Sequence, residues 1–273
     1  MFTWRPFDVW QTAERMTYFS YYDASGTQGS GACLSVVGVL ATESRWKTFD
    51  KRWTAILGRE GVTTLHMKDF IPCRGEFSEW KDDGRRRETF LLDLLGTLRG
   101  QYHIFAAAIV LQEFNRVNHY FKLAEVYGDG HRESGAYSFL ADNVRAQVRD
   151  WMKRRHVSAS LRHVFEAGDT GQKALKQYSA KWFPGYEKVT DFLPKYDPTK
   201  GIRVRPFEAA DLIAWPYRRM FVALQRGGSR PDEVLLKTLI DEIQTMVSRA
   251  GFFSEKNLAR MCSENTHLVP PRE

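Results

Sequence analysis

Acidic residues stand at three separated places where this sequence could support metal chemistry. Asp23 ends an apolar, aromatic segment and is followed by a Gly/Ser-rich stretch, and Glu166 ends a second apolar segment beside two glycines. Glu208 and Asp211 are three residues apart, so they would share one face of a helix. Carboxylate oxygens suit hard cations such as Mg²⁺ or Mn²⁺, and such ions activate water for phosphodiester cleavage. We therefore expect Asp23, Glu166 and Asp211 to bind metal, with Glu208 assisting.

Each of these acids also has a purely structural interpretation. Asp23 could start a turn by bonding to the backbone a few residues later. Asp169, close behind Glu166, is best interpreted as the N-cap of the following helix. Glu208 and Asp211 could compensate the dipole of their own helix, although the apolar neighbours of Asp211 are unusual for a solvated acid.

The apolar pattern predicts the elements that must position these acids. Buried or half-buried strands are expected at residues 16–23, 32–41, 102–111, 160–166 and 189–193. Helices are expected at residues 42–58, 85–98, 112–126, 134–155, 173–182, 208–225 (interrupted at Pro216) and 232–249. A flexible Gly/Ser turn at 25–31 would join the first two strands as a hairpin. In this order, the acids at 23 and 166 would emerge at strand ends, where open α/β sheets commonly bind ligands.

This order of elements predicts the α/β class, with a mixed sheet flanked by helices. The ribonuclease-H-like fold begins with three antiparallel strands and then alternates helix and strand, and the order here fits it, as it fits several other α/β folds. We expect a single domain over residues 1–273, with a helical or irregular insert at about 43–100 between the second and third strands. A C-terminal helical extension is expected at about 230–273.

Composition bounds the class of protein. The 273 residues include 43% hydrophobic ones, which predicts a folded globular chain, and the net charge of +7 suits a nucleic-acid partner, DNA or RNA. The basic run at 149–155 could equally compensate a helix dipole. Neither a secretion signal nor a membrane span is recognisable, and three scattered cysteines argue against disulfides or a zinc cluster, so we expect a cytoplasmic protein without membrane contact. The oligomeric state is not determined by the sequence.

Three short segments together resemble a bacterial family, the domain-of-unknown-function 3800 family. They are Tyr22–Gly26, Leu65–Phe70 and Glu208–Ala214, and the resemblance spans about residues 16–225. It implies a ribonuclease-H-like fold and metal-dependent nuclease activity, with Asp23 and Asp211 as the foremost metal-binding candidates and with Glu208 and Glu166 in support. The family's usual Glu after the first Asp is Ala24 here, which puts that activity in question.

His66 belongs to the second of these segments and gives two further hypotheses. Near a metal site it could carry protons or contact phosphate, whereas a structural histidine would hydrogen-bond the insert to the rest of the domain. The segment at 75–87 could form a substrate-facing flap or pack as an ordinary loop.

The sequence leaves two hypotheses for the function. The protein is either a metal-dependent nuclease or phosphodiesterase, or a catalytically degenerate nucleic-acid-binding or interaction module on the same fold, as Ala24 hints.

Overall fold

The computed structural model describes residues 16–26, 33–169, 171–183, 185, 189–197, 199, 201–225 and 234–272. Most of the predicted Gly/Ser turn, the N-terminal segment at 1–15 and the predicted start of the last helix at 232 lie outside these residues. Within the described part, no helix is both long and apolar enough to cross a lipid bilayer.

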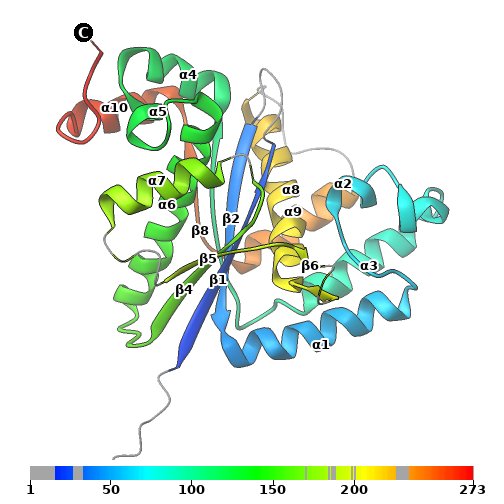
Figure 1. Cartoon of the computed structure of the whole chain (residues 1–273). Coiled ribbons are helices and arrows are strands. Elements are labelled where there is room, and N and C mark those ends of the chain that lie inside the picture. The colour runs from blue at the N-terminus through cyan, green and yellow to red at the C-terminus, as the bar shows by residue number, and fades with distance from the viewer. Residues whose placement is uncertain are drawn as a thin grey trace, which may run out of the picture.

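A mixed six-stranded sheet forms the centre of the described structure (Figure 1). Its strands are β1 (Thr17–Ser25), β2 (Cys33–Thr42), β3 (His103–Val110), β4 (Ser160–Glu166), β5 (Thr190–Leu193) and β8 (Val247–Phe253). Across the sheet their order is β5-β4-β1-β2-β3-β8. The first three strands pair antiparallel, β4 and β5 run parallel to β1, and β8 runs parallel to β3. The predicted α/β class with a mixed, helix-flanked sheet is therefore confirmed.

One face of the sheet is covered by the insert between β2 and β3 together with two late helices (Figure 1). These elements are α1 (Glu43–Arg59), α2 (Met67–Phe70), the 3-10 helix η1 (Gly75–Trp80), α3 (Gly84–Gly96), α8 (Arg205–Gln225) and α9 (Val234–Met246). Helix α1 buries Trp46, Phe49, Trp53 and Leu57, whose three- and four-residue spacing places them on one side of the helix. The predicted helical and irregular insert is thus present and packs against the sheet.

The opposite face carries a second core (Figure 1). It is covered by α4 (Leu111–Tyr120), α5 (Leu123–Val126), α6 (Arg132–Arg154), α7 (Gln172–Trp182) and α10 (Glu255–Glu264). Because helices cover both faces, the central strand β2 is buried along almost its whole length. This explains why its sequence is continuously apolar and does not alternate.

The structure corrects several predicted elements. The helix expected at 232–249 ends at Met246, and the chain continues as β8, so the C-terminal extension is not purely helical. Strand β8 has no fully buried residue and forms because β3 offers it an unpaired edge, which no local pattern signals. Helix α8 runs through Pro216 without ending there. A small hairpin that the sequence did not suggest, β6 (Tyr196–Asp197) with β7 (Ile202–Arg203), precedes α8.

Candidate active site

The first two acids lie side by side at the C-terminal ends of two neighbouring strands, β1 and β4. Parallel pairing aligns Tyr22 of β1 with Phe165 of β4, so the next residues along each strand, Asp23 and Glu166, are neighbours. The rings of Tyr22 and Phe165 stack on the opposite face with centroids 4.3 Å apart. Because adjacent side chains on a strand alternate between faces, both acids turn toward the face covered by α8. Ala24 packs into the core on the opposite face, so the side chain at position 24 does not face the carboxylates.

Helix α8 brings the third acid to the same edge. Ala209, Ala210 and Ala214 are fully buried, and the hydroxyl of Ser35 on β2 donates to the carbonyl of Ala214 at 3.2 Å. These small side chains let the helix lie close to β1 and β2. Asp211 therefore meets the sheet edge, and its Oδ2 accepts a hydrogen bond from the backbone N–H of Met67 at 3.0 Å.

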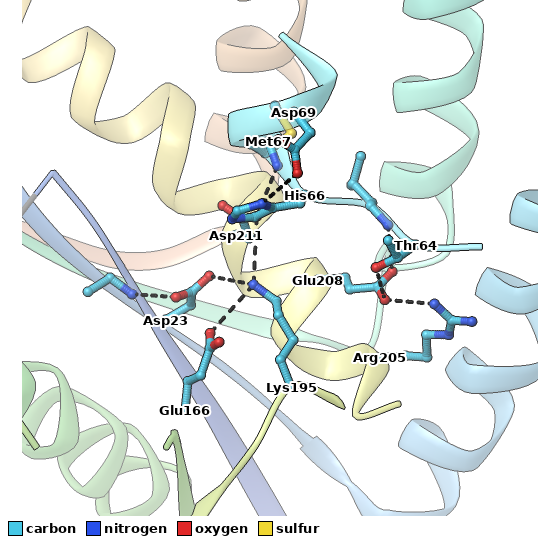
Figure 2. A network of polar contacts seen from close by, with 12 residues as sticks. Asp23, Thr64, His66, Met67, Asp69, Glu166, Lys195, Arg205, Glu208 and Asp211 are labelled. Carbon is cyan, nitrogen blue, oxygen red and sulfur yellow. Dashed lines mark hydrogen bonds and ion pairs between the residues drawn. The ribbon is translucent and has the colours of Figure 1, made fainter. Parts of the chain in front are cut away.

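A lysine that sequence reasoning missed lies at the centre of the three acids (Figure 2). The Nζ of Lys195 is 3.6 Å from Asp23 Oδ2, 3.5 Å from Glu166 Oε2 and 3.7 Å from Asp211 Oδ2. Lys195 comes two residues after β5, the strand that runs parallel to β4. The rule that singled out Asp23 and Glu166, attention to charged residues at the ends of predicted strands, extends to Lys195 when cations are considered as well as acids.

The local electrostatics show more negative charge than the lysine neutralises. Burial raises the pKa of Asp23 well above its usual range; the Lys195 ammonium opposes this shift, and the carboxylates of Asp211 and Glu166 add to it. Burial alone would lower the pKa of Lys195, but the carboxylates of Asp23, Asp211 and Glu166 outweigh it and raise that pKa. The site therefore favours additional positive charge.

Asp169 is a fourth carboxylate of this cluster, and its predicted role as an N-cap is wrong. The N-cap of α7 is Gly171, and the Asp169 side chain instead accepts a hydrogen bond from the Tyr137 hydroxyl at 3.1 Å. Burial and the neighbouring Glu166 carboxylate raise the pKa of Asp169 to about 6. Gly171 makes room for this contact, because a Cβ there would lie 2.2 Å from the Tyr137 ring.

Glu208 is placed differently from the other predicted acids. Four donors saturate its two oxygens: the Trp53 indole N–H at 2.7 Å, the Thr64 hydroxyl at 2.9 Å, the Leu65 backbone N–H at 3.1 Å and the Arg205 guanidinium at 2.7 Å. Its side chain is 2% exposed. Glu208 therefore ties α8 to the insert, and the carboxylate has little capacity left for a metal ion.

His66 reaches the edge of the cluster from the insert (Figure 2). Its Nδ1 is 3.0 Å from Asp69 Oδ2, and its Nε2 is 3.9 Å from Asp211 Oδ2. The imidazole is half-exposed, so it is open to a ligand as well as to Asp211. Both hypotheses for His66 remain compatible with this position, since it connects the insert to the site and also borders it.

The segment at 75–87 is mostly packed into the insert. Phe77 and Trp80 are buried, the Arg86 guanidinium lies 4.1 Å from the Trp80 ring centroid, and the guanidinium of Arg87 donates to the carbonyl of Ile71 at 2.9 Å. These contacts use both aromatic side chains and two of the three arginines of the Arg85–Arg87 run. The loop-packing interpretation of this segment therefore fits better than a substrate-facing flap.

The donor set fits a hard divalent cation in its chemistry but not in its present spacing. Three carboxylates converge on one point, and oxygen ligands are those that Mg²⁺ and Mn²⁺ prefer. In the part of the chain that the structure describes, no group of three or more acidic, His or Cys side chains is spaced to hold a metal ion. The Lys195 ammonium takes the central position instead, so binding of a metal ion would require the three carboxylates to move closer together.

Neither a family model nor a curated protein sequence matches this chain. The resemblance to the domain-of-unknown-function 3800 family therefore stays a prediction, and the geometry of the carboxylate cluster carries the functional argument.

Proposed function

We propose that the protein is a metal-dependent nuclease or phosphodiesterase whose active site is the cluster of Asp23, Glu166 and Asp211. The observation that carries this proposal is the convergence of three carboxylates, from β1, β4 and α8, on a single point within 3.7 Å. Carboxylates gathered in a partly buried site repel one another, and a bound cation offsets that cost without protonating them.

The sheet supports a ribonuclease-H-like assignment. Three antiparallel strands open the sheet, and two later strands run parallel to the first. The predicted fold has the same opening followed by alternating helix and strand. The cluster lies where the two parallel strands β1 and β4 end, the usual ligand-binding edge of an open α/β sheet.

The residues of the cluster have distinct roles in this proposal. Asp23, Glu166 and Asp211 would hold Mg²⁺ or Mn²⁺, with Asp169 available beside them. The bound ions would supply Lewis-acid activation of a water nucleophile and stabilise the leaving oxygen. His66, oriented by Asp69, would hold or move a proton at its Nε2 atom next to the site.

A groove beside the cluster supports nucleic acid as the substrate. It has a volume of about 610 Å³, and its lining includes Phe19 and Tyr21, which alternate with Asp23 on the same face of β1. Lys51, Arg203 and Arg205 lie along the same groove, together with the carboxylates of Glu43 and Asp50 and with Lys47, whose ammonium is 2.7 Å from Glu43. Aromatic rings beside cationic groups suit bases and phosphates, and the net charge of +7 would attract a polyanion.

A cleavage assay tests this proposal. Purified protein with Mn²⁺ or Mg²⁺ is incubated with labelled single- and double-stranded DNA and RNA, and EDTA serves as the metal-free control. We expect cleavage that Asp23→Asn and Asp211→Asn each reduce by on the order of 10³-fold, as for loss of a group that stabilises the transition state. Asp82→Asn, at an exposed position in the insert, should leave the rate unchanged. Cleavage that persists in both site variants would refute the assignment.

The second candidate is a nucleic-acid-binding or interaction module with a degenerate site. The position of Lys195 favours it, because an ammonium already compensates part of the carboxylate charge. Ala24 does not bear on this choice, because it packs into the core on the opposite face of the sheet. Binding of nucleic acid without cleavage under either metal would support this alternative over the nuclease.

A further inference from the structure

Lys195 occupies the point that the three carboxylates surround (Figure 2). Its Nζ is nearly equidistant from Asp23, Glu166 and Asp211, at 3.5 to 3.7 Å. The three acids come from separate elements, whereas the lysine comes from a fourth segment, between β5 and β6. The ammonium thus stands where a metal ion shared by the same three carboxylates would stand.

The backbone around Lys195 directs it to this point. The carbonyl of Lys195 accepts a hydrogen bond from the N–H of Val204 at 3.0 Å, just before α8 begins. Two residues earlier, the carbonyl of Leu193 accepts from the N–H of Ala167 at 2.8 Å, just beyond Glu166. Lys195 is therefore fixed at the junction between the end of β4 and the start of α8, the two elements that carry Glu166 and Asp211.

The hairpin that follows Lys195 is small. Strands β6 and β7 pair through two residue pairs, and the side chains of Tyr196 and Ile202 are 43% and 53% exposed. Few buried apolar contacts therefore hold this hairpin, and regions of that kind open at low free-energy cost. The Lys195 side chain itself needs only rotations about its flexible stem to leave the cluster.

An ammonium and a divalent cation cannot share this point. Metal–oxygen distances are about 2.0–2.6 Å, so the carboxylates would have to close on the position that Nζ now fills. A double positive charge attracts the three carboxylates more strongly than a single one does. Occupation by lysine and occupation by metal are therefore alternatives.

We propose that Lys195 is a built-in counter-cation, which stabilises the metal-free cluster and must leave when Mg²⁺ or Mn²⁺ binds. The displacement of Lys195 by a metal ion rests on the proposed metal-dependent function. The stabilisation of the metal-free cluster by Lys195 does not depend on that function. Lys195 thereby lowers the affinity for metal while it keeps the site assembled in the metal-free protein.

The first experiment removes the charge in the absence of metal. Lys195→Met keeps most of the side-chain volume, and in EDTA we expect its Tm to fall by roughly 4–8 °C. Adding Asp23→Asn to this variant should recover part of the loss, because one uncompensated carboxylate disappears. Lys195→Arg, which keeps the charge, should remain close to the wild type. An unchanged Tm for Lys195→Met in EDTA would overturn the counter-cation role.

The second experiment measures metal binding directly by titration calorimetry with MgCl₂ and MnCl₂. We expect Lys195→Met to bind with a Kd about tenfold lower than the wild type, since the competing charge is gone. Lys237→Met, an exposed lysine of α9, removes the same net charge elsewhere and should leave the Kd unchanged. Equal affinity in wild type and Lys195→Met would overturn the competition while leaving the metal site intact. Absence of binding in every variant would overturn both the competition and the proposed metal-dependent function.

Discussion

Glu208 and Asp211 lie one turn apart on α8, yet their surroundings are opposite. Glu208 receives hydrogen bonds from four donors, among them Trp53 and Arg205, and its side chain is 2% exposed. Asp211 receives one backbone hydrogen bond and shares a single lysine with Asp23 and Glu166. The first carboxylate has enough donors to be stable without a ligand, whereas the second belongs to a group with excess negative charge.

This difference separates a structural acid from a functional one. A buried carboxylate with a full set of donors holds two elements together, here α8 and the insert. A set of carboxylates with too few partners persists at a cost to stability and is typical of a site that binds a cation. Helix position alone does not distinguish the two, because both acids occupy the same helix three residues apart.

The largest effect that tests this comparison is on stability. Glu208→Ala would leave the buried Trp53 and Leu65 donors without their acceptor and the Arg205 charge without its carboxylate, and we expect a loss of about 3–5 kcal/mol in the free energy of unfolding. Urea denaturation followed by tryptophan fluorescence measures it. Glu79→Ala, at an exposed position in the insert, should cost less than about 0.5 kcal/mol. Similar costs for the two variants would show that Glu208 is not an anchor.

Asp169, which belongs to the carboxylate cluster, depends on close packing between Gly171 and Tyr137. A methyl group there would lie 2.2 Å from the Tyr137 ring and would push the hydroxyl away from Asp169. We expect Gly171→Ala to cost about 2 kcal/mol, as for other overpacked positions, in thermal denaturation. Gly58→Ala meets open space within α1 and should be neutral or slightly stabilising. If Gly171→Ala is as harmless as Gly58→Ala, Tyr137 does not hold Asp169 in place.

A smaller change sharpens the description of the Glu208 anchor. Thr64→Val removes the hydroxyl that donates to Glu208 Oε1 while keeping the side-chain shape, and we expect a cost of about 1–1.5 kcal/mol. Thr63→Val is the matched control, because its hydroxyl donates to Glu76 at an exposed site, where the loss should be only a few tenths of a kcal/mol. Equal losses in equilibrium unfolding would contradict the difference between the two carboxylates.

The smallest expected effect has the opposite sign and depends on pH. Folding raises the pKa of Asp169 to about 6 from the usual value near 4, so the folded protein binds the proton more tightly than the unfolded chain. The folded state is therefore progressively disfavoured as pH rises from about 4 to 6. In EDTA at pH 7, Asp169→Asn should stabilise the protein by roughly 1 kcal/mol, and at pH 4 the gain should vanish. A gain that does not change between these pH values would show that the Asp169 charge is not its cause.

Local patterns in the sequence were sufficient for much of the fold and for the main acids. Apolar strands that end in Asp23 and Glu166 predicted carboxylates at strand ends, where open α/β sheets commonly bind ligands. The apolar neighbours of Asp211 predicted an acid that is not simply solvated. Both predictions depend on properties of a few neighbouring residues, which is why they could be made without any knowledge of distant partners.

The roles of Glu208, Lys195 and Asp169 were decided by the tertiary structure. Three of the four donors to Glu208 come from Trp53, Thr64 and Leu65, more than 140 positions away, and nothing near Glu208 in the sequence indicates them. Strand β8 likewise forms because β3 has a free edge. A sequence determines which groups can carry charge and where strands can end, but whether a charge is compensated depends on partners that only the folded chain brings within hydrogen-bonding distance.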